Sequence, residues 1–196
     1  IDTNLFRFVK KDPAQRKKIL SIRPYASRVY ANDLMVNAIV ELSSRSWFNE
    51  LEFLVIGNGV LFDETVEPLK QFKNVTLFKG FLSQSEIAKL HREYGIFLCP
   101  SRMDTQGVSR DEAMASGLVP VTNRVGAISE FVPENAGFLC DPESYLQLVD
   151  SIEALYSDPA RFCQMSGQAA QTVRADRSST LICTLETQLL SDRKMP

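Results

Sequence analysis

The sequence predicts an α/β fold, in which a doubly wound, mostly parallel sheet of about six strands has flanking helices and ends in C-terminal helices. Two observations predict it. Short apolar runs alternate with helix-length amphipathic stretches along the chain, which is the order of β-α units. Several of these runs, such as residues 51–56 (LEFLVI), contain almost no polar alternation, as expected of strands that are covered on both faces.

Each element follows from this alternation and from capping residues. The expected strands are residues 18–22, 51–56, 75–78, 96–99, 119–122 and 137–140. The expected helices are residues 32–44, 64–71, 85–94, 108–115 and 144–156, and then residues 159–190 with an interruption around 174–179. Ser83 and Glu86 form a capping-box pattern before one helix, and Asp158 precedes a proline at the first position of another.

The length of 196 residues fits one domain with a core large enough to fold without disulfides or metals. Residues 1–17 are polar and lack periodicity, so we expect a linker remnant from a missing N-terminal domain. Residues 18–190 would form the domain itself, and residues 191–196 a tail. The formal net charge is −2 and both signs are spread along the chain, which predicts no nucleic-acid partner.

Cysteine and histidine usage predicts no metal site. Cys99, Cys140, Cys163 and Cys183 are far apart without a CxxC pattern, and we expect reduced core cysteines of a cytoplasmic protein. His91 is the only histidine, so zinc ligands would be scarce. We expect it to be a half-exposed helix residue without an acid partner, and not a catalytic base. The apolar runs are too short to span a bilayer.

In open α/β sheets the ligand binds outside the carboxyl ends of the strands. This rule selects the loops at residues 23–31, 57–61, 79–83, 100–107 and 123–126. No Walker A loop, DxD metal motif or GxSxG elbow occurs in the sequence, which argues against an NTPase or an α/β-hydrolase.

The loop after Cys99 has the richest chemistry. Gly107 precedes a predicted helix whose first-turn amides and dipole favour a phosphate, and glycine would allow its close approach. Asp104 in the loop and Glu112 in the helix suit hydroxyl groups of a ribose and a sugar. The spacing alone equally fits a helix N-cap and a first-turn acid that interacts with the dipole, and that alternative stays open here.

Two other loops offer weaker signals. Gly57 and Gly59 follow a strongly apolar strand, where a tight turn explains them equally well. Arg23 and Arg28 lie in the loop after the first strand, where a guanidinium could reach a diphosphate or could simply be solvated.

Taken in order, these segments resemble the C-terminal, donor-binding domain of retaining glycosyltransferases of the GT-B fold, family 4 (group 1), which is Rossmann-like. The similar segments are ILSIRPYASRVYANDL, LEFLVIGNG, NVTLFKGFLSQSEIAKLH, FLCPSRMDTQGVSRDEAMASGLVPVTNRVGAISEFV and GFLCDPESY. The fourth is the most specific, because it contains the acid-x7-acid pattern of the family from Asp104 to Glu112 and the Glu-Ala-Met helix.

The resemblance implies a role for each site residue. Glu112 would bind the ribose hydroxyls of the donor and Asp104 would contact the transferred sugar, and both are candidate catalytic residues. Backbone amides at Gln106, Gly107 and Val108 would hold the sugar and diphosphate. Arg23 and Arg28 would neutralise the diphosphate, and Gly57 and Gly59 would form the turn beside it.

The sequence departs from the family pattern at three points. Asp104 stands where a glutamate is usual, and Gln106 stands where an aromatic residue is frequent. The first loop lacks the usual Gly-Arg and Lys-Gly pairs; Arg23 aligns with the arginine, whereas Arg28 does not align with the lysine.

The function implied is transfer of a hexose-type sugar from a nucleotide-diphosphate sugar, with retention, in polysaccharide or glycoconjugate biosynthesis. The reaction would need no metal or other cofactor. The acceptor would be held by the N-terminal domain that is missing here, so this chain alone would be inactive, and any peripheral membrane association would run through that domain. Two alternatives remain: a non-catalytic nucleotide- or glycan-binding module, and a GT-B-fold sugar-nucleotide epimerase.

Overall fold

The computed structural model describes residues 1–192 and confirms the predicted fold class. Six parallel strands form one sheet in the order β3-β2-β1-β4-β5-β6. The strands are β1 (Lys18–Ile22), β2 (Glu52–Gly57), β3 (Val75–Lys79), β4 (Ile96–Leu98), β5 (Val119–Asn123) and β6 (Phe138–Cys140). The chain builds outward from β1 to β3 and then returns to place β4 on the other side of β1, so the strand order reverses between β1 and β4.

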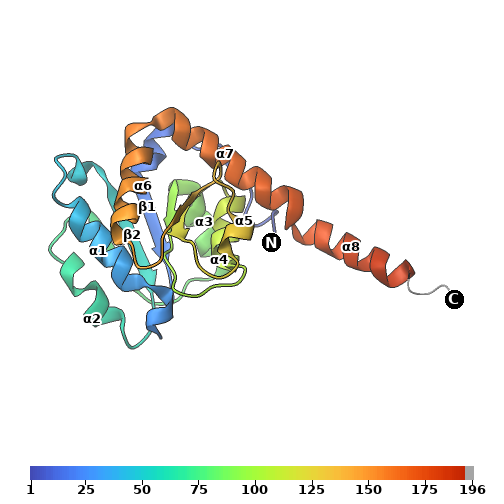
Figure 1. Cartoon of the computed structure of the whole chain (residues 1–196), viewed down its shortest axis with the longest axis horizontal. Helices are drawn as coiled ribbons and strands as arrows, with labels where there is room; N and C mark the ends of the chain where they lie inside the picture. Colours follow the sequence, from blue (N-terminus) through green and yellow to red (C-terminus); the bar gives the residue numbers. More distant parts are fainter. Residues whose placement is uncertain (193–196) are drawn as a thin grey trace.

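Helices cover both faces of this sheet (Figure 1). The longer helices of the body are α1 (Asn32–Leu42), α3 (Gln84–Glu93), α4 (Val108–Ala115), α6 (Tyr145–Ser157) and α7 (Pro159–Asp176). Two short ones are α2 (Phe62–Val66) and α5 (Ile128–Phe131). One large hydrophobic cluster joins α1, α2 and α6 to one face, while α3 and α4 pack on the other.

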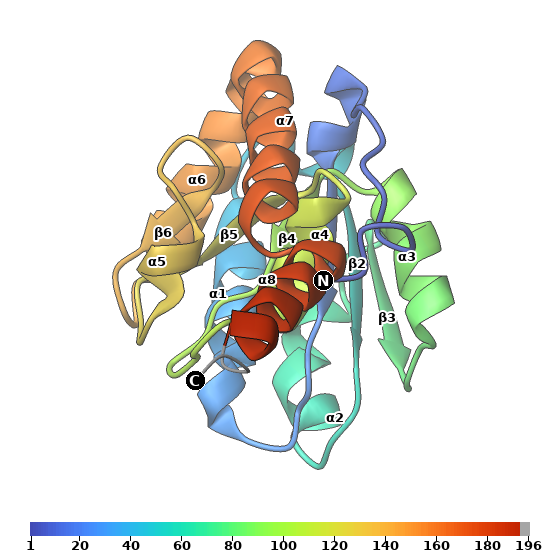
Figure 2. The same ribbon diagram turned by 90° about the vertical axis from the view of Figure 1, so that its right-hand side faces the viewer.

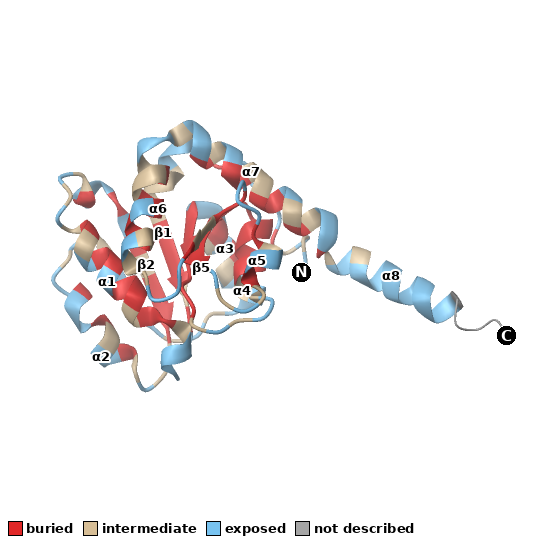
Figure 3. Ribbon diagram, in the orientation of Figure 1, coloured by how far each residue is buried: buried red, intermediate tan, exposed pale blue. Residues whose placement is uncertain are grey.

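Burial on both faces explains the unbroken apolar strands. Adjacent residues of β1 point to opposite faces, and both Ile19 and Leu20 are buried, each in a different cluster. Figure 3 shows the strands as buried segments between partly exposed helices. The predicted runs therefore indicate strands of a covered parallel sheet.

Most predicted boundaries lie within two residues of those in the structure, and the helix at residues 108–115 agrees at both ends. The prediction of one continuous helix over residues 64–71 is wrong. α2 ends at Val66 and a 3-10 turn, Glu67–Leu69, follows it. Pro68 lies in this turn, where a proline cannot donate an α-helical hydrogen bond.

Residues 1–17 pack against the domain. Phe6 is buried against α4 and α7, Lys11 is buried, and Pro13–Lys17 form a 3-10 turn before β1. The Nζ of Lys11 donates to the backbone carbonyl of His91. This packing makes the prediction of a half-exposed His91 wrong, because its side chain is 1% exposed between Phe6 and Phe97.

The last helix, α8 (Ser179–Asp192), points away from the body of the domain (Figures 1 and 2). The predicted interruption before it is confirmed, whereas the predicted tail is helical as far as Asp192 and otherwise lies outside the described residues. The prediction of core cysteines is confirmed for Cys99 and Cys140, which are buried. It is wrong for Cys183, which is exposed on α8, and for Cys163, which is only half-buried. Within residues 1–192, no helix is both long and apolar enough to cross a bilayer.

Candidate functional site

A cavity of about 420 Å³ lies at the carboxyl ends of the strands, where the strand order reverses. Four of the five predicted loops contribute to its wall: those that carry Arg23, Gly57 and Phe81, and the one that carries both Asp104 and Gly107. Open α/β sheets bind ligands at this topological switch point, because two neighbouring loops diverge there and leave a crevice. The loop rule applied to the sequence therefore located the cavity.

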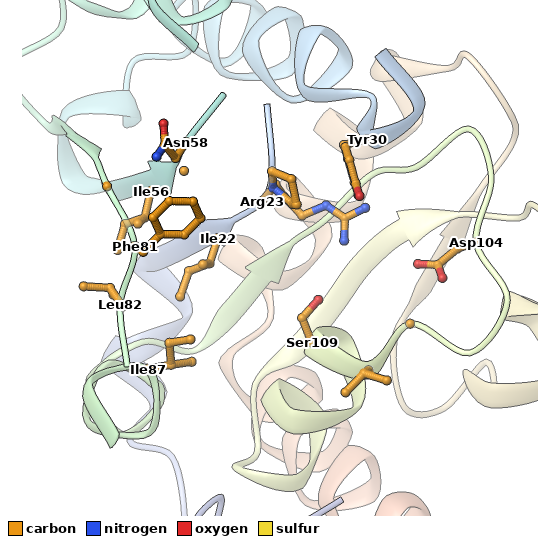
Figure 4. Close-up of a pocket in the computed structure, with 15 residues that line it drawn as sticks. Ile22, Arg23, Tyr30, Ile56, Asn58, Phe81, Leu82, Ile87, Asp104 and Ser109 are labelled. Carbon is orange, nitrogen blue, oxygen red and sulfur yellow. The ribbon is translucent and has the colours of Figure 1, made fainter. Parts of the chain in front are cut away.

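The cavity has an apolar side and a polar side (Figure 4). Ile22, Ile56, Phe81, Leu82 and Ile87 form the apolar side. The opposite side carries Arg23, Tyr30, Asp104 and Ser109, and the backbone at Gly107. A ligand with a flat apolar ring at one end and anionic or hydroxyl groups at the other would match both sides.

Arg23 follows directly after β1 and is 7% exposed. Its Nη2 donates to the Pro100 carbonyl at 3.4 Å, and its guanidinium lies 5.2 Å from the centre of the Tyr30 ring. The Nε is buried without a hydrogen-bond partner among residues 1–192. Arg23 is thus a positively charged side chain fixed on the cavity wall, with N–H groups that can still donate to an anion.

Gly57 and Gly59 hold the first loop in place. The turn they form hydrogen-bonds to Tyr25, whose N–H donates to the Asn58 carbonyl at 2.8 Å. A Cβ on Gly57 would lie 2.2 Å from the Arg23 carbonyl oxygen, and one on Gly59 would lie 2.2 Å from the Tyr25 carbonyl carbon. Gly57 lines the cavity, whereas Gly59 packs against the backbone of Tyr25 and is not among the lining residues.

Helix α4 begins at the cavity. Its N-cap is Gly107, with φ 73° in the left-handed region that favours glycine, and no side chain caps the helix among the described residues. Its first-turn amides are therefore free to donate to a ligand, and the positive end of the dipole faces the same space. The structural alternative for the two acids does not hold, because Asp104 is not the N-cap and the first-turn acid is Asp111.

Asp104 lines the cavity from the loop before α4. Its Oδ1 accepts from the Thr105 N–H at 2.8 Å. Gly126, with φ 52°, packs so closely that a Cβ there would lie 2.1 Å from the Asp104 carbonyl oxygen. The loop after β5 thereby positions the backbone of Asp104.

Glu112 is 8% exposed and lies outside the cavity wall. Gln84, at the start of α3, donates from Nε2 to Oε1 of Glu112 at 3.3 Å. Burial raises the pKa of the Glu112 carboxyl above its usual range. The positively charged amino group of Ile1 and the Gln84 hydrogen bond oppose this rise. The carboxylate is thus covered by Gln84, which begins the same helix that contributes Ile87 to the apolar side of the cavity.

Of the remaining predicted residues, Val108 lines the cavity, whereas Arg28 and Gln106 do not. Arg28 is exposed and lines a separate depression of about 210 Å³ with Asp33 and Glu64. Gln106 is exposed, its carbonyl accepts from Arg110, and Val108 lines the cavity at the first position of α4. Within the described residues, no group of three or more His, Cys, Asp or Glu side chains is arranged to hold a metal ion.

Sequence reasoning missed several residues of the cavity. Tyr30, Phe81 and Ser109 line it, although no pattern distinguished them from ordinary loop residues. The Ser83 capping box was a usable signal, because it fixed the loop at residues 79–83 at the end of β3 and so placed Phe81 at the carboxyl edge of the sheet. Gln84 was missed because its contact with Glu112 joins two helices.

The strand order and the cavity at the switch point define a Rossmann-like domain of the class that binds ligands at the carboxyl edge of its sheet. The family model described as "Glycosyl transferases group 1" matches residues 2–173. This chain belongs to the group 1 glycosyl transferase family.

Two curated relatives illustrate the range of the family. One component of the human phosphatidylinositol N-acetylglucosaminyltransferase is 30% identical over 147 residues, which covers 72% of this chain and 30% of that protein. The GDP-mannose-dependent alpha-mannosyltransferase of Corynebacterium glutamicum is 24% identical over 182 residues, or 92% of this chain and 41% of that protein. The chain thus spans less than half the length of these relatives.

Solved structures show the same fold. The C-terminal domain of a group 1 glycosyl transferase, LpcC, from Francisella tularensis has a TM-score of 0.77 at 21% identity, with 91% of this chain and 99% of that chain covered. Anabaena Alr3699/HepE in complex with UDP and glucose has a TM-score of 0.78 at 16% identity, with 98% and 55% covered. At these identities the comparison defines the fold of the chain.

Proposed function

We propose that this chain is the donor-binding domain of a retaining glycosyltransferase and binds a nucleotide-diphosphate sugar in the cavity at the switch point. The observation that carries the proposal is the two-sided cavity, with an apolar wall at Phe81, Leu82 and Ile87 and with Arg23 and the N-terminus of α4 opposite. The structure of Alr3699/HepE, described with UDP and glucose bound, has this fold and supports the assignment.

Each part of the donor has a complementary region. The base would lie against the apolar wall, and the diphosphate would accept from Arg23 and from the amides at Gly107 and Val108. The ribose would reach Glu112 once Gln84 gives way, and the transferred hexose would lie beside Asp104. Arg28 does not face this cavity, so we assign the neutralising role to Arg23 alone.

Transfer would proceed through an oxocarbenium-like transition state, in which the diphosphate leaves from the face that the acceptor attacks. Catalysis would then consist of positioning and of charge stabilisation on the leaving group, which Arg23 and the α4 dipole can supply without a metal or cofactor. The acceptor would be held by an N-terminal domain outside this chain. We place the full protein in the cytoplasm, in polysaccharide or glycoconjugate biosynthesis.

A thermal-shift screen of the chain against UDP-, GDP- and ADP-sugars tests the proposal. A ligand at 100 times its dissociation constant should stabilise the domain by about 2.7 kcal/mol, and EDTA should not change the shift. Arg23→Met should abolish most of the shift, whereas the exposed Arg92→Met should leave it intact. The proposal is wrong if no sugar nucleotide raises the midpoint, or if both variants behave alike.

A further inference from the structure

A cluster of buried charges lies beneath the N-terminus of α4. It consists of Arg110, Asp111 and Arg177, which are 2%, 0% and 9% exposed, and we call it the α4 charge cluster. Oδ1 of Asp111 accepts from Nη2 of Arg110 at 2.9 Å and from Nη1 of Arg177 at 3.0 Å. Arg177 directly follows α7, so the cluster joins residues 66 positions apart.

Among residues 1–192, two guanidinium groups of the cluster share one carboxylate, so the cluster carries one uncompensated positive charge. Both guanidinium groups lie near the Phe131 ring, at 5.7 Å and 5.4 Å from its centre. Nη1 of Arg110 has no hydrogen-bond partner in the described part of the chain. Burying a surplus charge lowers stability unless a counter-charge lies close by, so the cluster favours an anion bound near it.

The position of Arg110 relates this charge to the cavity. A Cβ on Gly107, which lines the cavity, would lie 2.8 Å from Nη1 of Arg110. Nη2 of Arg110 also donates to the backbone carbonyl of Gln106. The guanidinium therefore lies directly behind the backbone that forms the polar wall.

The same hydrogen bond orients an amide. The Gln106 carbonyl and the Gly107 N–H belong to one trans peptide unit, so they point in opposite directions. Because Arg110 holds the carbonyl toward the protein interior, the Gly107 N–H is held on the opposite side of the peptide, away from the cluster. Arg110 thus fixes the direction of a donor at the start of α4.

We propose that the α4 charge cluster is a positioning and electrostatic element for the diphosphate of the donor. Arg110 orients the peptide between Gln106 and Gly107, and Arg177 supplies the surplus charge that strengthens phosphate binding from behind the cavity wall. The inference rests on the proposed function, and it adds residues that never touch the ligand. The counter-charge that the cluster requires is the diphosphate itself.

A charge series separates the electrostatic role from simple support of the fold. Arg177→Met makes the cluster neutral and leaves the contact between Arg110 and Gln106 in place. Asp111→Asn combined with Arg177→Met restores one positive charge. Arg174→Met is the matched control, because it removes an arginine of α7 that is not in the cluster. The Nη2 of Arg174 approaches the backbone carbonyls of Thr3 and Phe6, and that of Ala115 at the last residue of α4.

Calorimetric titration of the 196-residue chain with UDP, GDP and ADP, and with the corresponding nucleosides, provides the measurement. Arg177→Met should lower the affinity for the preferred diphosphate at least roughly tenfold, the size expected of one positive charge acting on a single phosphate charge over about 10 Å at an effective dielectric constant of ~20. The double variant should recover most of this affinity, Arg110→Met should lose more than Arg177→Met, and nucleoside affinity should stay the same throughout.

The outcomes are distinguishable. The inference is overturned if the wild type binds a diphosphate but Arg177→Met and Arg174→Met lower the affinity equally, or if the double variant binds no better than Arg177→Met. If the cluster only supports the fold, the double variant should bind no better than Arg177→Met, because it removes more contacts than the single variant. If the wild type binds none of the three diphosphates, the proposed function fails, and this inference fails with it.

Discussion

Gln84 donates from its Nε2 to Oε1 of Glu112 across 3.3 Å, and so links the first residue of α3 to the middle of α4. Gln84 is exposed while Glu112 is buried, so the amide covers the carboxylate at the domain surface. A ligand hydroxyl that reaches Glu112 must replace this amide or share the carboxylate with it. The Gln84 amide therefore covers the carboxylate that we propose binds the ribose.

Glu112→Gln should weaken binding of the preferred nucleoside diphosphate by roughly tenfold to a hundredfold, because hydrogen bonds to a charged acceptor contribute about 1.5–3 kcal/mol each. The 2′,3′-dideoxy form of the same nucleotide lacks the ribose hydroxyls and should bind both proteins equally. Calorimetry with the two nucleotides checks this. Equal losses for the two would show that Glu112 does not contact the ribose.

The same substitution should stabilise the fold at neutral pH. The pKa of Glu112 is raised in the folded state by burial, so its favourable contribution is complete below the unfolded pKa and is lost as pH rises through the folded pKa. Glu112→Gln should therefore raise the free energy of unfolding on the order of 1 kcal/mol at pH 7. Urea unfolding should show the gain disappearing near pH 4; a gain that is independent of pH would contradict this cause.

Gly126→Ala should destabilise the domain by on the order of 1–3 kcal/mol, because its φ of 52° strains an L residue and its Cβ would meet the Asp104 carbonyl oxygen. Displacement of Asp104 should also lower affinity for the sugar nucleotide more than for the diphosphate alone. Gly167→Ala is the control, since a Cβ there meets nothing within 4 Å and α7 should gain about 0.5–1 kcal/mol. Thermal unfolding with and without each ligand measures both effects, and equal behaviour of the two variants would refute the prediction.

His91 should make the domain lose stability in mild acid. Burial, with a smaller effect of nearby Lys11, lowers the pKa of His91 to about 3, whereas an unfolded histidine titrates near 6.5. Between these values the unfolded chain binds the proton, so stability present above pH 6.5 is lost by up to about 1.4 kcal/mol per pH unit as pH falls. His91→Gln should remove this component in urea unfolding at pH 7, 6, 5 and 4; unchanged slopes would place the titration elsewhere.

Arg102→Lys should destabilise the domain by about 1 kcal/mol at neutral pH. Arg102 forms two paired contacts, with Asp33 and with Glu143, at 2.7–2.8 Å, and all three groups are partly solvent-exposed. A lysine ammonium cannot form both pairs of parallel hydrogen bonds that the guanidinium forms with the two carboxylates. Arg102→Lys and the exposed control Arg92→Lys are compared by urea unfolding.

The hydrogen bond from Arg102, more than its charge, lowers the pKa of the Asp33 carboxyl. The stabilisation is therefore present above the ordinary aspartate range and is lost as pH falls through the lowered pKa, so the difference between wild type and Arg102→Lys should shrink in strong acid. A constant difference at all pH values would mean that the lost contact to the Arg28 carbonyl, and not the ion pairs, causes the effect.

Local sequence determined the sheet, most helices and the place of the cavity. Strands and helices differ in hydrophobic period, and residues such as Ser83, Gly107 and Asp158 mark helix starts within a few residues of chain, so these features need no knowledge of distant contacts. The rule that ligands bind at strand carboxyl ends then selected the loops of Arg23, Asp104 and Gly107. The roles of these residues in sugar transfer remain predictions.

Only the tertiary structure decided which side chains face the cavity and which are covered. His91 is buried because the segment containing Phe6 and Lys11 packs over it. Arg28 lines a different depression from Arg23, although both lie on the same loop. Arg110 and Arg177 both pair with Asp111. The physical reason is that burial and ion pairing arise from contacts between segments far apart in the chain, which no local period or cap encodes. The sequence could thus indicate which loops form the cavity, but the packing decides which charged side chains face it.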